Sequence, residues 1–174
     1  MALAYAAVTC QMRNDLPRLR QAAAELRDLC DRYDFAYYRE WGVVLDGWSR
    51  PDGDGIDLAR RGIDTLRSQN SFTRMPYWLS LLADLLARNG QAAAARASLD
   101  AALTAGQAHG DLWWLPEVMR MRAAYDDEAA ALTRLRAAAR MAAGHGSVPL
   151  LRRCEDDLGR RGVRLAAPAE GPTG

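Results

Sequence analysis

Lysine is absent from this chain of 174 residues, so all 23 basic side chains are arginines, set against 22 acidic ones. The resulting net charge of +1 gives no overall field that would recruit nucleic acid or an anionic membrane. No apolar run reaches the roughly 20 residues needed to span a bilayer. The apolar start of the chain, residues 1–10, also lacks the basic region of a signal peptide. We therefore expect neither direct nucleic-acid binding nor membrane association.

Cysteine is scarce as well, with Cys10, Cys30 and Cys154 far apart in the sequence and no CxxC pair. An odd number of widely spaced cysteines argues against a disulfide framework and against a zinc site. We expect reduced thiols in a cytoplasmic protein, most of them filling space in the core.

Motifs that carry catalysis are also missing: there is no GxxxxGK[ST], GxSxG or HExxH sequence. Residues 52–57 suggest a calcium loop, but Asp57 stands where such a loop needs glycine and Ile63 where it needs glutamate, so a helix cap explains them better. His109 and His145 have no metal-binding partners at a suitable spacing. We predict no metal, no cofactor and no enzymatic activity; an enzyme built from residues distant in sequence is the least favoured alternative.

Apolar residues recur at helical spacing along most of the chain, and the alternation typical of strands is nearly absent. Gly, Pro, Asp and Asn mark helix boundaries. Asn14-Asp15 is expected to cap a helix with Pro17 in its first turn, Asp34 to open the next helix and Asp54 to cap the one after it. Residues 110–111 and Asp126-Asp127 are expected to begin later helices. One domain is expected over residues 1–165, followed by a disordered tail at 166–174. The predicted helices cover about residues 2–12, 16–33, 34–50, 54–66, 71 or 73 to 89, 91–109, a segment from 110–111 onward, 126–144 and 147–162.

A short pattern of mostly small residues, spaced by four and then three, recurs four times with offsets of 33, 40 and 36 residues. Residues at this spacing share one helix face, and small side chains there let a neighbouring helix approach closely. The four sets are Ala22, Leu26 and Leu29; Gly55, Ala59 and Gly62; Ala95, Leu99 and Ala102; and Ala131, Leu135 and Ala138.

The third set resembles the tetratricopeptide repeat, in which two antiparallel helices carry small residues at fixed places. Ala83, Ala95 and Ala102 match these places, whereas Leu86 and Leu99 replace the usual aromatic residues and the final proline is missing. The resemblance implies an all-α fold: an α-solenoid of about four antiparallel helix pairs forming a right-handed superhelix.

A second pattern appears when several segments are taken in order: Gly47-Trp48, Gly55-Ile56, Leu58, Tyr77-Trp78-Leu79, Leu82-Ala83, Trp113-Trp114, Glu117, Arg120 and Arg122. With these residues, about residues 20–165 resemble the C-terminal helical region of large bacterial regulators of the ATPase, adenylate-cyclase and LuxR types. The resemblance implies a scaffold that recognises a protein partner or an inducer. The chain itself contains no ATPase or cyclase sequence.

The function expected from these patterns is a non-catalytic interaction module of a signalling or transcription-regulatory system. It would bind a protein through its concave groove or the ends of the stack. The alternative is a small-molecule sensor with an aromatic-lined groove, in which Arg39 or Arg74 would help to read an anionic group. The candidate groove residues are Trp78, Trp113, Trp114, Glu117 and Arg120. Core packing is the alternative for the aromatic residues, and helical periodicity places Trp78 on the buried side of its predicted helix.

A homodimer is also predicted, because Leu3, Tyr5 and Val8 recur near the N-terminus without nearby charge. The rival prediction is that residues 2–12 fold back onto their own first helix pair and leave a monomer.

Overall fold

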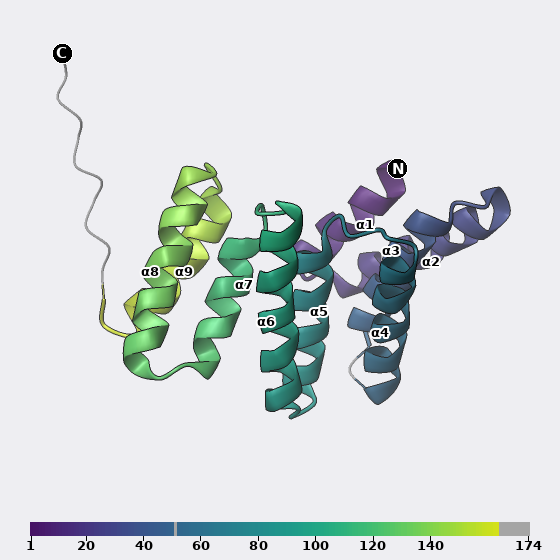
Figure 1. The fold of residues 1–174 in the computed structure, drawn as a ribbon. Coiled ribbons are helices and arrows are strands. Elements are labelled where there is room, and N and C mark those ends of the chain that lie inside the picture. Colours follow the sequence, from purple (N-terminus) through teal and green to yellow (C-terminus); the bar gives the residue numbers. More distant parts are fainter. Residues whose placement is uncertain (51, 164–174) are drawn as a thin grey trace, which may run out of the picture. The chain divides into compact units, whose positions relative to one another are not determined.

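The structure is a computed structural model that describes residues 1–50 and 52–163, so the predicted disordered tail at 166–174 lies outside it. The described residues form helices and connecting turns, with no strand among them, which confirms the all-α class (Figure 1). The helices are α1 (Ala2–Met12), α2 (Leu16–Tyr33), α3 (Ala36–Trp48), α4 (Gly53–Ser68), α5 (Met75–Arg88), α6 (Ala92–His109), α7 (Leu115–Arg122), the short 3₁₀ helix η1 (Ala123–Tyr125), α8 (Glu128–Gly144) and α9 (Val148–Arg160).

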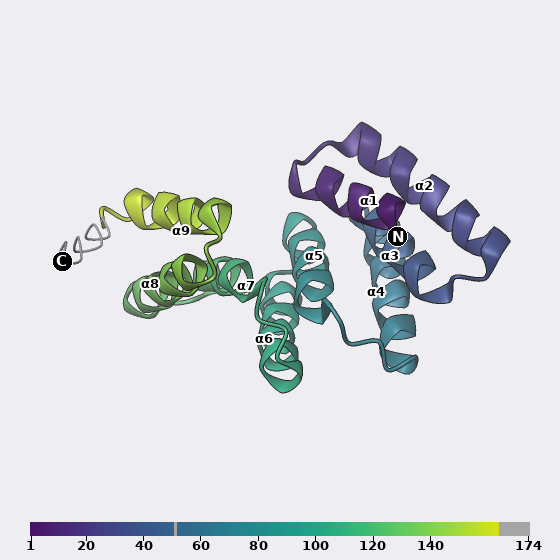
Figure 2. The same ribbon diagram turned by 90° about the horizontal axis from the view of Figure 1, so that it is seen from above.

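The chain divides into two compact units, Met1–Asp111 with α1–α6 and Leu112–Gly174 with α7–α9. In the first unit α1 packs on α2, α2 on α3, α3 on α4 and α5 on α6; α1 also touches α3, and α3 touches α5 (Figure 2). In the second unit α8 packs on both α7 and α9. Helices therefore pack mainly against their neighbours in sequence. Among the described helices, none is both long enough and apolar enough to cross a membrane.

Side-chain caps fix several helix starts as the sequence predicts. The Asp15 side chain accepts a hydrogen bond from the Arg18 amide, with Pro17 in the first turn, and Asp127 caps α8 through the Ala130 amide. Each cap satisfies an amide that has no partner within its helix.

Three predicted boundaries are wrong by a few residues. Asp34 ends α2 in the left-handed conformation instead of opening the next helix. Asp52, not Asp54, caps α4 through the Gly55 amide. Residues 110–111 do not begin α7, which starts at Leu115. The Asp111 carboxylate instead accepts a 2.5 Å hydrogen bond from the Arg74 amide, a partner that no local pattern could reveal.

The recurring small residues lie at helix contacts in three of the four predicted sets. Ala95 and Ala102 on α6 are fully buried, as are Ala131 and Ala138 on α8. The first set is out of register, because Leu29 is 38% exposed. The residues that α2 buries at this spacing are Leu19, Ala23 and Leu26.

A close helix contact joins α3 and α4 through glycines. A Cβ atom on Gly47 would lie 2.7 Å from both the Ala59 nitrogen and the Gly55 carbonyl oxygen. One on Gly55 would lie 2.6 Å from the Gly47 carbonyl oxygen. Since real Cβ atoms do not approach backbone so closely, only glycine permits this crossing.

The three cysteines are free thiols, as expected, with Cys30 and Cys154 buried and Cys10 partly buried. Burial raises the pKa of Cys154 to about 12, so this thiol packs as a small apolar group.

Candidate functional site

The core of the first unit is an aromatic cluster that includes Trp78, one of the predicted groove residues. The rings of Trp41 and Trp78 have centroids 5.1 Å apart, and Tyr77 lies 4.7 Å from Trp78. Trp78 is 0% exposed. The structure therefore corrects its assignment: it stabilises the packing of α3 and α5 and reaches no surface groove.

Arg74, at the start of α5, links α1 to this aromatic cluster. Its guanidinium carbon lies 5.0 Å from the Tyr5 ring centroid and 5.3 Å from that of Trp41, which are cation–π distances. Its Nη2 also donates a 3.1 Å hydrogen bond to the Tyr5 hydroxyl. Nearby, the Tyr77 hydroxyl donates to the Gln11 side chain at 2.7 Å, and burial raises the pKa of Tyr77. The Arg74 side chain therefore contributes to the packing of α1 and not to a site for an external anion.

Because α1 docks within its own chain, the three residues of the predicted dimer contact, Leu3, Tyr5 and Val8, differ in exposure. Val8 is 4% exposed within its own chain and Leu3 is partly buried, whereas Tyr5 is 42% exposed but held by Arg74. Because α1 packs on α2 and α3, the structure matches the rival prediction for residues 2–12, and Val8 is unavailable to a second copy.

Trp113 and Trp114 lie in the turn before α7, with ring centroids 4.9 Å apart. Trp114 is 6% exposed and Trp113 partly buried, so neither is an open surface aromatic. Their burial favours packing over an open, aromatic-lined groove.

Glu117 and Arg120 lie together on α7 at the centre of an ion network. Glu117 accepts hydrogen bonds from Arg120 Nε at 2.9 Å and Nη2 at 3.0 Å, and from Arg153 Nη1 at 2.8 Å. Arg120 Nη1 donates to Asp157 at 2.6 Å, and Asp157 also pairs with Arg160. The Glu117 side chain is only 7% exposed, whereas Arg153 is 41% and Arg160 72% exposed. The centre of the network at Glu117 is therefore shielded from water, and its ion pairs join α7 to α9.

The partners of this network on α9, Arg153 and Asp157, are not among the candidate residues that the sequence indicates. Their spacing of four residues places them on one helix face, which is the available signal. Nothing in the sequence indicates that this face turns toward α7.

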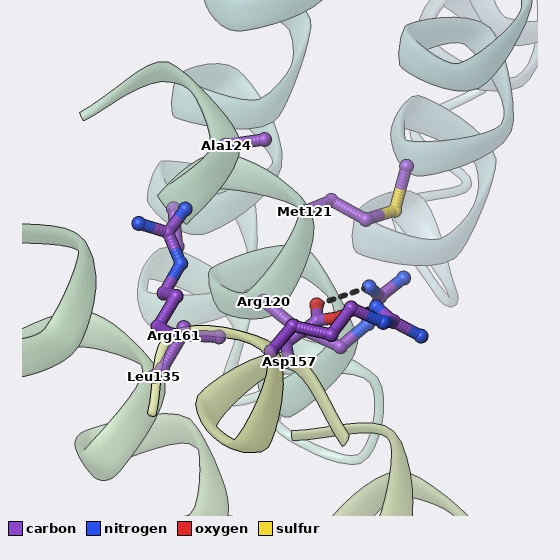
Figure 3. A pocket seen from close by; sticks show the side chains of 8 residues that line it. Arg120, Met121, Ala124, Leu135, Asp157 and Arg161 are labelled. Carbon is purple, nitrogen blue, oxygen red and sulfur yellow. Dashed lines mark hydrogen bonds and ion pairs between the residues drawn. The ribbon is translucent and has the colours of Figure 1, made fainter. Parts of the chain in front are cut away.

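A hollow of about 350 Å³ opens beside the network and is called here the arginine hollow. Figure 3 shows Arg161 across it from Arg120 and Asp157, with Leu135 beside Arg161 and Met121 on the opposite side. Arg161 pairs with Glu128, whose side chain is 63% exposed. An external carboxylate would therefore compete with existing acidic partners. The lining residues are Arg120, Met121, Ala123, Ala124, Leu135, Asp157, Arg160 and Arg161.

A second, wider depression of about 600 Å³ runs along α7 and α8 and is called here the α7–α8 groove. Its charged members are already engaged: Asp127 caps α8, and Arg134 binds Asp126 at 2.6 Å. What the groove presents is mainly methyl groups and the Met119 side chain. The lining residues are Met119, Asp127, Ala129, Ala130, Thr133, Arg134 and Ala137.

Within the part of the chain that the structure describes, no group of three or more His, Cys, Asp or Glu residues is arranged to hold a metal ion.

Comparison with known proteins finds one informative similarity. An uncharacterised protein of Rhizobium meliloti (strain 1021) is 25% identical over 166 residues, a match that covers 90% of this chain but 16% of that protein. The chain thus spans about a sixth of the length of this relative. No family model matches the chain, and no solved structure matches it significantly.

Proposed function

We propose that this chain is a tetratricopeptide-like interaction module, arranged as an α-solenoid, within a cytoplasmic bacterial signalling or transcription-regulatory system. Two findings support the proposal. Helices pack mainly on their sequence neighbours, with small residues at the contacts. A similar segment forms a small part of a much longer bacterial protein, as expected for a module.

The observation that carries the proposal is the α7–α8 groove. Its lining of alanines, Thr133 and Met119 is smooth and mostly apolar, while Asp127 and Arg134 are occupied within the chain. Such a surface fits the apolar face of a helix or peptide, and methionine adapts readily to different partners. Its charged residues hold helices in place, so we propose binding and not catalysis as its role.

The test is a matched pair of substitutions, Ala129→Glu in the groove and Ala93→Glu outside it. Both alanines are exposed and occupy the second position of their helices, α8 and α6, where a carboxylate is compatible with the helix dipole. Stability should therefore change little in either variant, as circular dichroism can verify.

The two variants and the wild-type chain would be used for quantitative cross-linked capture from the bacterium that encodes the chain. A protein captured by the wild type and by Ala93→Glu but lost with Ala129→Glu supports the proposal. Equal capture by both variants, or no specific capture, contradicts it.

The arginine hollow favours one second candidate, a sensor for a small carboxylate. Arg160 and Arg161 border an apolar floor that includes Leu135 and Ala123, which would suit a short acyl chain with an acidic end. In a thermal-shift screen of small carboxylates, a ligand should raise the melting temperature of the wild type and of Arg136→Gln but not of Arg161→Gln. A shift that survives Arg161→Gln places the ligand elsewhere.

A further inference from the structure

Three large apolar side chains are exposed to solvent close to the turn between α2 and α3. Leu29 is 38%, Tyr33 59% and Phe35 55% exposed, and the Tyr33 and Phe35 rings stack with centroids 6.3 Å apart. We call these three residues the aromatic corner; Figure 2 shows the turn that carries it at the far end of α2. Clustered exposed aromatic residues are typical of binding surfaces, where they contribute most of the affinity.

The aromatic corner continues along one face of α2 that the core does not use. Helix α2 buries Leu19, Ala23, Leu26 and Cys30 within the unit. At about 100° per residue, Ala22, Glu25, Leu29, Arg32 and Tyr33 fall within an arc of about 100° beside that buried stripe. The face is therefore long, continuous and available to a partner.

The two ends of this face complement each other in size. Leu29 lies near its middle, the rings of Tyr33 and Phe35 lie at one end, and the small Ala22 lies at the other. If two copies of α2 pack antiparallel across Leu29, the aromatic rings of each copy meet the Ala22 end of the other, about 10 Å from the centre at 1.5 Å per residue.

The charged residues on this face are also complementary when two copies pack antiparallel. Glu25 lies about 6 Å before Leu29 along the helix axis and Arg32 about 4.5 Å after it. Antiparallel pairing therefore brings each Glu25 opposite the Arg32 of the other copy. Neither residue forms an ion pair within residues 1–50 and 52–163, where Glu25 only accepts a hydrogen bond from Gln21 at 2.8 Å.

We infer that this face of α2, with the aromatic corner, binds a second copy of the chain in a two-fold symmetric, antiparallel contact. A two-fold contact requires a surface that complements itself, and this face does so in both size and charge. The inference is independent of the α7–α8 groove, so either proposal can fail alone. It also replaces the Leu3, Tyr5 and Val8 stripe as the dimer contact.

Charge exchange tests the inference by sedimentation equilibrium between about 1 and 100 µM. Glu25→Arg and Arg32→Glu each place like charges together twice per dimer, and each should raise the dimer dissociation constant about tenfold or more. The double variant restores opposite charges and should return the constant to within about threefold of the wild type. Arg136→Glu, an exposed site on α8, is the charge control and should change nothing.

A second set of variants tests the apolar contact. Phe35→Ser should abolish the dimer, whereas Val148→Ser, which removes an apolar side chain that is 53% exposed on α9, should not. Circular dichroism establishes that both remain folded. A wild-type chain that is monomeric at 100 µM overturns the inference, as does a dimer that persists in Phe35→Ser or a double charge variant that fails to recover.

Discussion

Glu117 shows how a single buried carboxylate holds two helices together. It receives three hydrogen bonds from two arginines, and its removal would leave Arg120, which is 24% exposed, with Asp157 alone. We predict that Glu117→Gln lowers the free energy of unfolding by about 2–3 kcal/mol, since hydrogen bonds to charged groups are lost in a shielded place. Urea denaturation measures this change.

The matched control is Asp64→Asn, which breaks an exposed pair with Arg67 on α4 and should cost less than about 0.5 kcal/mol. Equal effects of the two substitutions would show that the Glu117 network contributes no more than a surface ion pair.

Asp126 predicts a pH dependence in the acid range. Burial alone would raise the pKa of this carboxyl, but hydrogen bonds and charges from Arg134 and Arg122 outweigh it and lower the pKa below its usual 3.8. A lowered folded-state pKa stabilises the protein above the unfolded-state pKa, and that stabilisation is lost as the pH falls through the folded-state value. Wild-type stability should therefore fall more steeply below about pH 4 than that of Asp126→Asn. Parallel curves from pH 5 to 2 would contradict the prediction.

At the scale of the helix, the same substitution should have opposite effects at two glycines. Gly47→Ala would push a methyl group into the α4 backbone and should cost about 1–3 kcal/mol. Gly159→Ala, within α9, meets nothing within 4 Å and should stabilise by about 0.5–1 kcal/mol through helix propensity. Thermal unfolding shows whether each substitution lowers or raises the stability of the protein. A stable Gly47→Ala protein would mean that α3 and α4 do not cross here.

At the scale of the molecule, the division at residue 111 predicts that the first unit folds alone. Residues 1–111 hold their own core, including the fully buried Trp78, Tyr77 and Leu45, and keep the Asp111 carboxylate bound to the Arg74 amide. The isolated 1–111 segment should show a strongly helical far-UV spectrum and one cooperative unfolding transition. A broad, non-cooperative transition would mean that this unit depends on the rest of the chain.

Single residues differ in how much of their role the sequence predicts. The caps at Asp15 and Asp127 are predicted correctly, because capping depends on amides only two or three residues away. Periodicity predicts Trp78 on the buried side of its helix, where it lies, but its assignment to a groove is wrong, because a helix apolar on nearly every side gives no direction to a single aromatic. Leu29 belongs to the predicted small-residue pattern but is exposed, since the pattern starting at Leu19 has the same spacing and is the one buried.

The sequence by itself determined the approximate positions of the helices and three of the four sets of residues at helix contacts, since periodicity, caps and small side chains act within one or two turns. Only the tertiary structure decided that Arg153 and Asp157 turn inward to meet Glu117 and Arg120. The same holds for Arg74, which reaches back to Tyr5, and for Phe35, which stays exposed. These outcomes depend on which helix faces meet. Which faces meet depends on contacts between side chains that are 36 to 69 positions apart in the sequence, and local sequence patterns do not predict such contacts.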